Sequence, residues 1–140
     1  MFGNAFEKRL KDLAKRSGLK IADSSSERAK LLFNINGHRQ PLWILPYDGV
    51  WEFSCPSVIA VDDVDIIPKP VLQAVLARNA TMKRGFWCIE KIGGKYVLEY
   101  MHNVPEQLLT PDEFHSICWS VVKEVERLED AFRELLGIAA

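Results

Sequence analysis

The sequence predicts an α+β fold in which helices pack on one face of an antiparallel sheet. Three patterns indicate it: an amphipathic helix at the start, short strands joined by tight turns in the middle, and a long amphipathic helix at the end. The expected order is an N-terminal helix, an antiparallel β-meander, a short helix, a β-hairpin and a long C-terminal helix packed on one face of the sheet. At 140 residues the chain has the length of one domain, residues 1–140.

The first helix is predicted over residues 1–17. Its apolar side chains recur at helical spacing, at Phe2, Phe6, Leu10 and Leu13. Gly18 is expected to end it, because glycine readily adopts the left-handed conformation of a helix exit. The remaining surface carries basic side chains, at Lys8, Arg9, Lys11, Lys15 and Arg16. We interpret them as a solvated helix face.

Three strands are predicted next, over residues 30–35, 42–47 and 50–55. Two dipeptides that favour two-residue hairpin turns, Asn36-Gly37 and Asp48-Gly49, separate them. A short strand near Ile21 precedes them, and residues 58–61 are compatible with more strand. Pro41 and Pro46 lack a backbone donor, so the second strand is expected to lie at a sheet edge or to end at Pro46.

The second half of the chain begins with a short helix between Pro68 and Asn79. A hairpin then turns at Gly93-Gly94, with strands over 85–92 and 95–102. The last helix starts with three agreeing signals: Thr110 as cap, Pro111 in the first turn, and Glu113 able to close a capping box. Its apolar residues recur at intervals of four and three up to Gly137, at Phe114, Cys118, Val121, Val125, Leu128, Phe132 and Leu135.

No catalytic, cofactor or metal site is expected from the sequence, so the protein is predicted not to be an enzyme. Its histidines and cysteines lack metal-ligand or redox spacing: His38, His102, His115, Cys55, Cys88 and Cys118. There is no glycine-rich phosphate loop and no nucleophile elbow. The acidic run 62–65 lacks the glycine and distal glutamate of an EF-hand, and we interpret it as solvated carboxylates ahead of a helix.

Charge and hydropathy indicate which partners and which cellular location to expect. The formal net charge of -1 gives no overall attraction to nucleic acid or anionic lipid. The first helix lacks the continuous apolar run of a signal peptide, and no other stretch is long and apolar enough to span a bilayer. We therefore expect a cytoplasmic protein that does not bind membranes.

The unusual feature is a surplus of large apolar residues. The tryptophans stand at Trp43, Trp51, Trp87 and Trp119. The strand 42–45 is apolar on both faces, although a sheet covered on one side should alternate there. Trp119 and Val122 also lie off the apolar seam of the last helix. Either the fold covers both sheet faces, or a partner covers part of this surface, and a second copy of the chain is one such partner.

Several local motifs of the second half resemble a known family. They are Leu76-Ala77-Arg78-Asn79 ending a helix, Gly85-Phe86 opening a strand, Gly93-Gly94 followed by Tyr96-Val97-Leu98, and Leu109-Thr110-Pro111-Asp112-Glu113-Phe114 opening the last helix. In these motifs, residues 70–137 resemble the YbjN-like proteins, whose fold is that of the type III secretion chaperones. The resemblance implies a helix–sheet–helix sandwich, often dimeric, without enzymatic activity. The secretion members of that fold bind extended segments of client proteins.

The resulting hypothesis is a non-enzymatic, chaperone-like domain that holds an extended or partly folded client protein on exposed apolar surface, as a homodimer. The candidate contact residues are Trp43, Trp51, Trp87 and Trp119, of which at least two are expected to be core residues. One alternative is a small-molecule-binding domain or enzyme with a pocket between the sheet and the long helix, which Glu99, Tyr100 or His102 pointing into one deep cavity would support. Another is a single-stranded nucleic-acid binder that uses the basic first helix.

Overall fold

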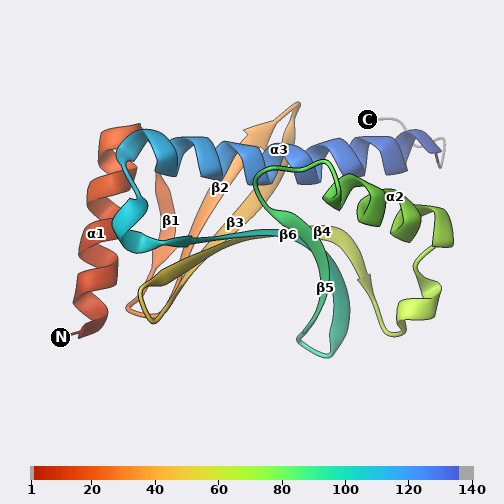
Figure 1. Ribbon diagram of the computed structural model, residues 1–140, viewed down its shortest axis with the longest axis horizontal. Helices are drawn as coiled ribbons and strands as arrows, with labels where there is room; N and C mark the ends of the chain where they lie inside the picture. The colour runs from red at the N-terminus through yellow and green to blue at the C-terminus, as the bar shows by residue number, and fades with distance from the viewer. Residues whose placement is uncertain (1, 136–140) are drawn as a thin grey trace.

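The predicted α+β fold is confirmed by a computed structural model that describes the backbone of residues 2–135 and the side chains of residues 5–134. Six antiparallel strands form one sheet in the order β1-β2-β3-β4-β6-β5, and α1 and α3 pack on one of its faces (Figure 1). The elements are α1 (Phe2–Ser17), β1 (Ile21–Ser24), β2 (Ala29–Ile35), β3 (His38–Tyr47), β4 (Val50–Val61), α2 (Lys69–Asn79), β5 (Phe86–Ile92), β6 (Lys95–Pro105) and α3 (Pro111–Leu135).

Local signals set the ends of the helices as predicted. Gly18 has a φ of 73°, and the next amide, that of Leu19, donates to the Ala14 carbonyl at 2.9 Å, which closes α1. At the start of α3, the amide of Glu113 donates to the Thr110 hydroxyl at 3.1 Å. The Glu113 carboxylate binds Arg84 at 3.1 Å instead of completing the capping box. The side chains of Phe2 and Leu135, and Gly137, lie outside the described residues.

The three predicted two-residue turns connect β2 to β3, β3 to β4 and β5 to β6. Both turn residues have positive φ in each case, for example 51° at Asn36 and 82° at Gly37. This geometry matches the twist of antiparallel strands and sets their register. The sheet therefore pairs Lys30 with Trp43, and Trp43 in turn with Ser54.

The prediction for β3 is wrong in one respect: it is an interior strand, and it continues past Pro46 to Tyr47. Along β3 the N–H groups point alternately to β2 and to β4. Counting from His38, the backbone N–H groups of even-numbered residues point to β2 and those of odd-numbered residues point to β4. The ladder with β2 ends at Ile44 and the ladder with β4 begins at Trp43. The nitrogen of Pro46 points to β2 but lies beyond the end of the β2 ladder. The nitrogen of Pro41 points to β4 but lies before the start of the β4 ladder. Neither proline therefore removes a hydrogen bond from the sheet.

The core lies between the sheet and the two long helices. Alternate residues of the strands point into it, such as Leu42 and Ile44 of β3, and Phe53 meets Phe114 of α3 with ring centroids 5.8 Å apart. On the opposite face of the sheet, no helix among residues 2–135 covers the central strands, so the other alternate residues remain open. No helix in this part of the chain has the length and apolar character needed to cross a membrane.

Candidate functional site

The uncovered face of the sheet forms a groove, which we call the open-face groove. It has a volume of about 350 Å³ and opens to solvent. Strands β3, β4, β5 and β6 supply most of its walls, and the segment before β2 adds one side chain. The lining residues are Arg28, Trp43, Leu45, Tyr47, Glu52, Ser54, Pro56, Glu90, Ile92, Val97 and Glu99.

Strand alternation explains which side chains reach this groove. Leu42 and Ile44 point to the helices, so Trp43, Leu45 and Tyr47 point to the other face. This arrangement explains why the sequence of β3 is apolar on both faces although helices cover only one face of the sheet. One set builds the core and the other builds the wall of the groove.

Trp43 combines apolar surface with neighbouring positive charge. The guanidinium carbon of Arg28 lies 5.6 Å from the centroid of the indole ring, and the ammonium nitrogen of Lys30 lies 5.3 Å from it. At these distances a cation is attracted by the π-electron face of the ring. Trp43 is half-buried, so part of its ring remains available to a further contact.

Three carboxylates give the groove its electrostatic character: Glu52 from β4, Glu90 from β5 and Glu99 from β6. The side chain of Glu99 is 2% exposed. Burial raises the pKa of Glu99 to about 8, and Glu90 and Glu52 add to the shift. Burial, with Glu90, also raises the pKa of Glu52. From the sequence, Glu99 is a candidate only for the alternative pocket, and Glu52 and Glu90 carry no signal that identifies them as site residues.

Cys88 lies beside Glu99 on the neighbouring strand. Its sulfur is 3.9 Å from Glu99 Oε1. Burial raises the pKa of the Cys88 thiol to about 12, with Glu99 and Glu90 contributing, so it stays protonated at neutral pH. A protonated thiol is a weak hydrogen-bond donor and a poor nucleophile.

The four tryptophans divide into two groups. Trp51, 1% exposed, packs edge-on against Phe6 of α1 at 5.0 Å, and Trp87, 4% exposed, packs on Tyr100 at 5.2 Å. Both are core residues with almost no surface to offer a partner. Trp43 lines the open-face groove, whereas Trp119 lies half-buried on α3. The structure therefore does not bring Trp43 and Trp119 to one face.

A charged network joins α2, α3 and β5 behind the groove. Glu124 accepts hydrogen bonds from Trp87 Nε1 at 2.9 Å, from Arg78 at 3.1 Å and from Arg127 at 3.0 Å. Burial alone would raise the pKa of Glu124, but the bonds from Arg127, Arg78 and Trp87 outweigh it and lower this pKa to about 2. The contacts of Arg78 and Trp87 link α2 and β5 to α3, whereas Arg127 lies one turn away from Glu124 on α3, so the network is a structural clamp.

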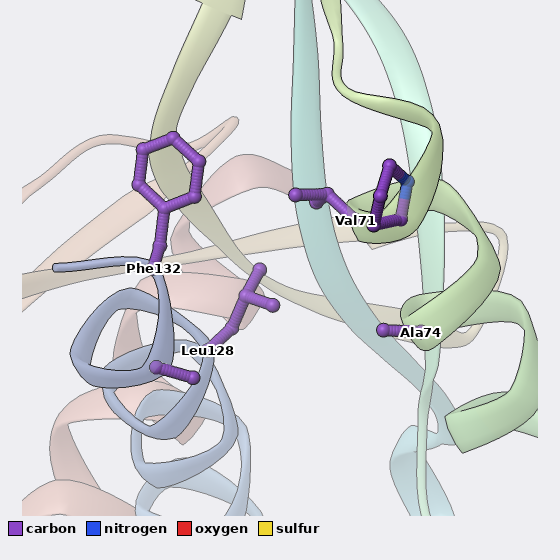
Figure 2. Close-up of a pocket in the computed structure, with 6 residues that line it drawn as sticks. Val71, Ala74, Leu128 and Phe132 are labelled. Atoms are coloured by element: carbon purple, nitrogen blue, oxygen red, sulfur yellow. The ribbon is translucent and has the colours of Figure 1, made fainter. Parts of the chain in front are cut away.

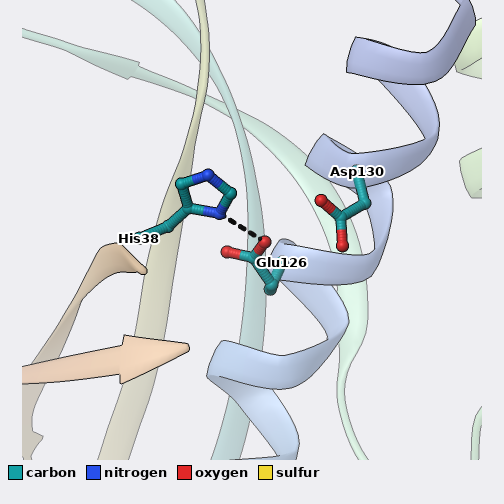
Figure 3. A group of neighbouring side chains, drawn as sticks. All are labelled: His38, Glu126 and Asp130. Atoms are coloured by element: carbon teal, nitrogen blue, oxygen red, sulfur yellow. Dashed lines mark hydrogen bonds and ion pairs between the residues drawn. The ribbon is translucent and has the colours of Figure 1, made fainter. Parts of the chain in front are cut away.

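Three possible metal ligands, His38, Glu126 and Asp130, lie within 4.8 Å of one another (Figure 3). Arg133 already fills the space among them. Its Nη2 atom lies 2.8 Å from Glu126, 2.6 Å from Asp130 and 3.1 Å from His38 Nδ1. We therefore assign this cluster to an ion-pair network and not to a metal site. Sequence spacing gave no signal for it, because His38 and Glu126 are 88 residues apart.

Two apolar surfaces flank α2. One is a small cleft between α2 and α3, where Val71 and Ala74 face Leu128 and Phe132 (Figure 2). The other lies between α2 and β5, has a volume of about 290 Å³, and is lined by Leu72, Val75, Leu76, Trp87, Cys88, Ile89 and Leu98. Leu76 is 68% exposed at its edge. We call this second surface the α2–β5 patch.

The structure does not bring together the three residues that would have supported the alternative pocket between the sheet and the long helix. Glu99 lines the open-face groove, whereas Tyr100 and His102 alternate to the face covered by α3. The Tyr100 hydroxyl donates to the Arg84 carbonyl at 2.5 Å. Burial, with Arg84 nearby, lowers the pKa of His102.

The basic face of α1 is partly neutralised within the chain. Lys11 pairs with Glu7 at 3.7 Å and Arg16 pairs with Asp12 at 3.2 Å. Arg9 donates to the carbonyl of Leu109 at 2.8 Å and thereby fastens α1 to the segment before α3.

Comparison with known proteins identifies the fold. No protein-family model matches the chain, and no curated protein sequence matches it. A chain of the HopA1–SchA chaperone–effector complex superposes with a TM-score of 0.62 at 9% identity, covering 89% of this chain and 93% of that one. A chain of the ExsC–ExsE complex gives a TM-score of 0.60 at 12% identity, covering 88% of this chain and 90% of that one.

YbjN from E. coli gives a TM-score of 0.56 at 16% identity, covering 86% of this chain and 83% of that one. All three likenesses extend over most of both chains. They confirm, at the level of fold, the resemblance to the YbjN-like proteins and the secretion chaperones that the local motifs of residues 70–137 predicted.

Proposed function

We propose that this protein is a chaperone-like binding domain that holds an extended segment of a client protein in the open-face groove. The observation that carries the proposal is the groove itself. Trp43, Leu45, Tyr47 and Ile92 present apolar and aromatic surface to solvent on a sheet face that no helix of residues 2–135 covers. Burial of such surface is the main driving force of protein association.

The form of the groove suits an extended chain. It crosses four neighbouring strands, so its apolar side chains are spread along a line. An extended segment places every second side chain on one face, about 7 Å apart, and can enter such a groove without folding first. The likeness to a chain of a chaperone–effector complex supports the same type of partner.

The proposal involves binding and no chemical step. The nucleophilic candidate beside the groove, Cys88, is a protonated thiol whose pKa is raised to about 12. The remaining polar groups of the groove are carboxyls and one serine hydroxyl, without a histidine to activate them. The protein is therefore proposed to act without catalysis.

We also propose that the protein is a homodimer joined through the α2–β5 patch. Leu76 projects beside a hollow formed by its own neighbours, so that in a two-fold pair each Leu76 can enter the hollow of the other copy. The patch belongs to the side of β5 that bears Trp87 and Ile89, whereas Glu90 and Ile92 face the groove. A second copy and a client can therefore be held at the same time.

The binding proposal is tested with an unfolded probe protein, reduced and carboxymethylated α-lactalbumin carrying a fluorescent label. Trp43→Ala is expected to weaken binding at least tenfold, while the free energy of unfolding changes by less than about 1 kcal/mol, because the ring is not part of the core. Trp119→Ala is the control for binding: that tryptophan lies on α3 and packs against Phe33 at 4.7 Å, so its loss should lower stability but leave the affinity of the folded protein unchanged. Equal binding by the wild type and the Trp43→Ala variant would contradict the proposal.

The dimer proposal is tested with Leu76→Glu. A charge where Leu76 would enter the partner's apolar hollow is expected to convert the dimer to a monomer in light scattering. Because Leu76 is 68% exposed, the variant should keep the thermal stability of the free monomer. A wild-type protein that is a monomer at 100 μM, or a Leu76→Glu variant that stays dimeric, would rule out this interface.

A further inference from the structure

The floor of the open-face groove carries a buried carboxyl group without a cationic partner. Glu99 is 2% exposed, and within residues 5–134 it is hydrogen-bonded to the thiol of Cys88 at 3.9 Å and to the carboxyl of Glu90, neither of which carries a positive charge. None of the ion pairs in this part of the chain includes it. Glu124 is buried to a similar extent, yet it is bound by two arginines.

A second polar group of the groove is also left without a partner. Ser54 is 5% exposed and lines the groove. Its hydroxyl has no hydrogen bond to any residue that the structure describes. Only the ionised form of Glu99 would need a counter-charge, and the residues that the structure describes supply none. Neither group is sealed off from the groove, so a cation from outside the chain can reach both of them.

The charge of the groove specifies that partner. Glu52, Glu90 and Glu99 face the groove, and the one basic residue that lines it is Arg28. Arg28 lies over Trp43 at 5.6 Å and forms no ion pair with any of the three glutamates. Lys30 lies over Trp43 as well, so that ring already has two cations, and the three carboxyls together with the Tyr47 ring remain to bind a further guanidinium or ammonium group.

We propose that the open-face groove selects extended client segments that carry an arginine or lysine side chain, which enters the groove beside Ser54 and pairs with Glu99. This inference rests on the proposed function, since it specifies what the same groove accepts. Apolar client residues two positions before and after the basic one would lie over Leu45, Ile92 and Val97, because alternate side chains of an extended chain share a face. The expected motif is therefore apolar-x-basic-x-apolar.

The pairing makes recognition depend on pH. The titratable and charged groups that face Glu99 come from each element around the groove: Cys88, Glu90, Glu52, Tyr47 and Arg28. The pKa of Tyr47 is raised above its usual 10, chiefly by burial, and that of Cys88 to about 12, so neither ionises between pH 6.5 and 8.5. Burial raises the pKa of Glu99 to about 8 in the unbound protein, and a bound cation would favour its ionised form.

The sign of this dependence follows from proton release. Below pH 8 the binding of a cation must first remove a proton from Glu99, so affinity increases as the pH rises and then levels off. For a pKa of about 8 the affinity for a basic segment should be roughly 20-fold higher at pH 8.5 than at pH 6.5. In Glu99→Gln this difference should disappear.

The test selects ten-residue peptides from a random displayed library on the immobilised full-length protein. The wild type is expected to enrich peptides with arginine or lysine at one fixed position, flanked at two residues' distance by apolar residues. Glu99→Gln should lose that preference while still enriching apolar peptides. Glu134→Gln, an exposed position on α3 away from the groove, is the matched control and should select as the wild type does.

The best selected peptide is then measured by fluorescence anisotropy at both pH values, together with the same peptide carrying citrulline in place of arginine. Citrulline keeps the shape of arginine without its charge, and at pH 8.5 it should weaken binding at least tenfold. Equal affinity for the two peptides, or enrichment of apolar peptides without a basic position, would overturn the inference and leave the proposed function standing. Selection of no peptide by the wild type, or identical selection by Trp43→Ala, would instead contradict the proposed function itself.

Discussion

Replacing Glu99 with glutamine is expected to stabilise the folded protein, and to do so only above about pH 5. Burial raises the pKa of this carboxyl from 4.5 to about 8. In the unfolded chain the group ionises near its ordinary value, so between the two values folding must take up a proton. Stability of the wild type therefore falls as the pH rises from about 4.5 to about 8 and is constant beyond it. Glutamine, which has nearly the same shape, does not titrate.

The size of the effect follows from the interval between the two pKa values. Each pH unit of that interval corresponds to about 1.4 kcal/mol. The open-face groove admits water to the carboxyl, which screens the effect, so we reduce the sum to about 2 kcal/mol at pH 8. For a domain of this length, that corresponds to an increase in melting temperature of about 6 °C. At pH 5 the difference should be less than about 1 kcal/mol.

The assay is urea unfolding of the wild type, Glu99→Gln and Glu134→Gln at pH 5 and pH 8, followed by tryptophan fluorescence. Glu134 is exposed on α3, so its substitution controls for the loss of one formal charge. A Glu99→Gln variant no more stable than the wild type at pH 8 would show that ionisation of Glu99 does not destabilise the fold. A gain of the same size at both pH values would also contradict the prediction, since that gain would not come from ionisation.

Two further substitutions test the contacts that support the groove. Glu124→Gln should destabilise the protein by roughly 2 kcal/mol at pH 7. The pKa of Glu124 is lowered to about 2, so the ionised carboxylate contributes its full stabilisation only above about pH 4.5. The difference in stability between the two proteins should therefore shrink as the pH falls from about 4.5 to about 2. Urea unfolding at pH 7 and pH 3 measures it. Gly85→Ala should cost more than about 2 kcal/mol, seen as a lower melting temperature. Its φ is 87°, and a Cβ would lie 2.5 Å from the Tyr100 ring and 2.8 Å from the Met101 carbonyl; an unchanged melting temperature would contradict this.

The features that were predicted correctly depend on neighbours in the sequence. The turn at Asn36-Gly37 and the helix exit at Gly18 require only that a residue adopt positive φ, and the bond from the Glu113 amide to Thr110 spans three residues. Periodic apolar residues fixed the long helix in the same way, because its buried side is defined by spacing along the chain. These signals were sufficient for the element order and the α+β class.

The place of β3 in the sheet was not predicted correctly, since it depends on where the neighbouring strands end. Pro41 and Pro46 are compatible with an interior strand only because the hydrogen-bonded pairing with β4 begins after Pro41 and the pairing with β2 ends before Pro46. The lengths of β2 and β4 set those limits, and neither is readable from β3 itself.

The sequence by itself determined that this chain has more large apolar residues than a one-sided sheet requires. Only the tertiary structure decided where they lie: Trp51 and Trp87 in the core, Trp43 in an open groove. It also brought Glu52, Glu90 and Glu99 together from three strands. Strand alternation gives each side chain one of two faces, but the packing of α1 and α3 decides which face is covered. Long-range packing therefore determines which residues become core and which remain available to bind a partner.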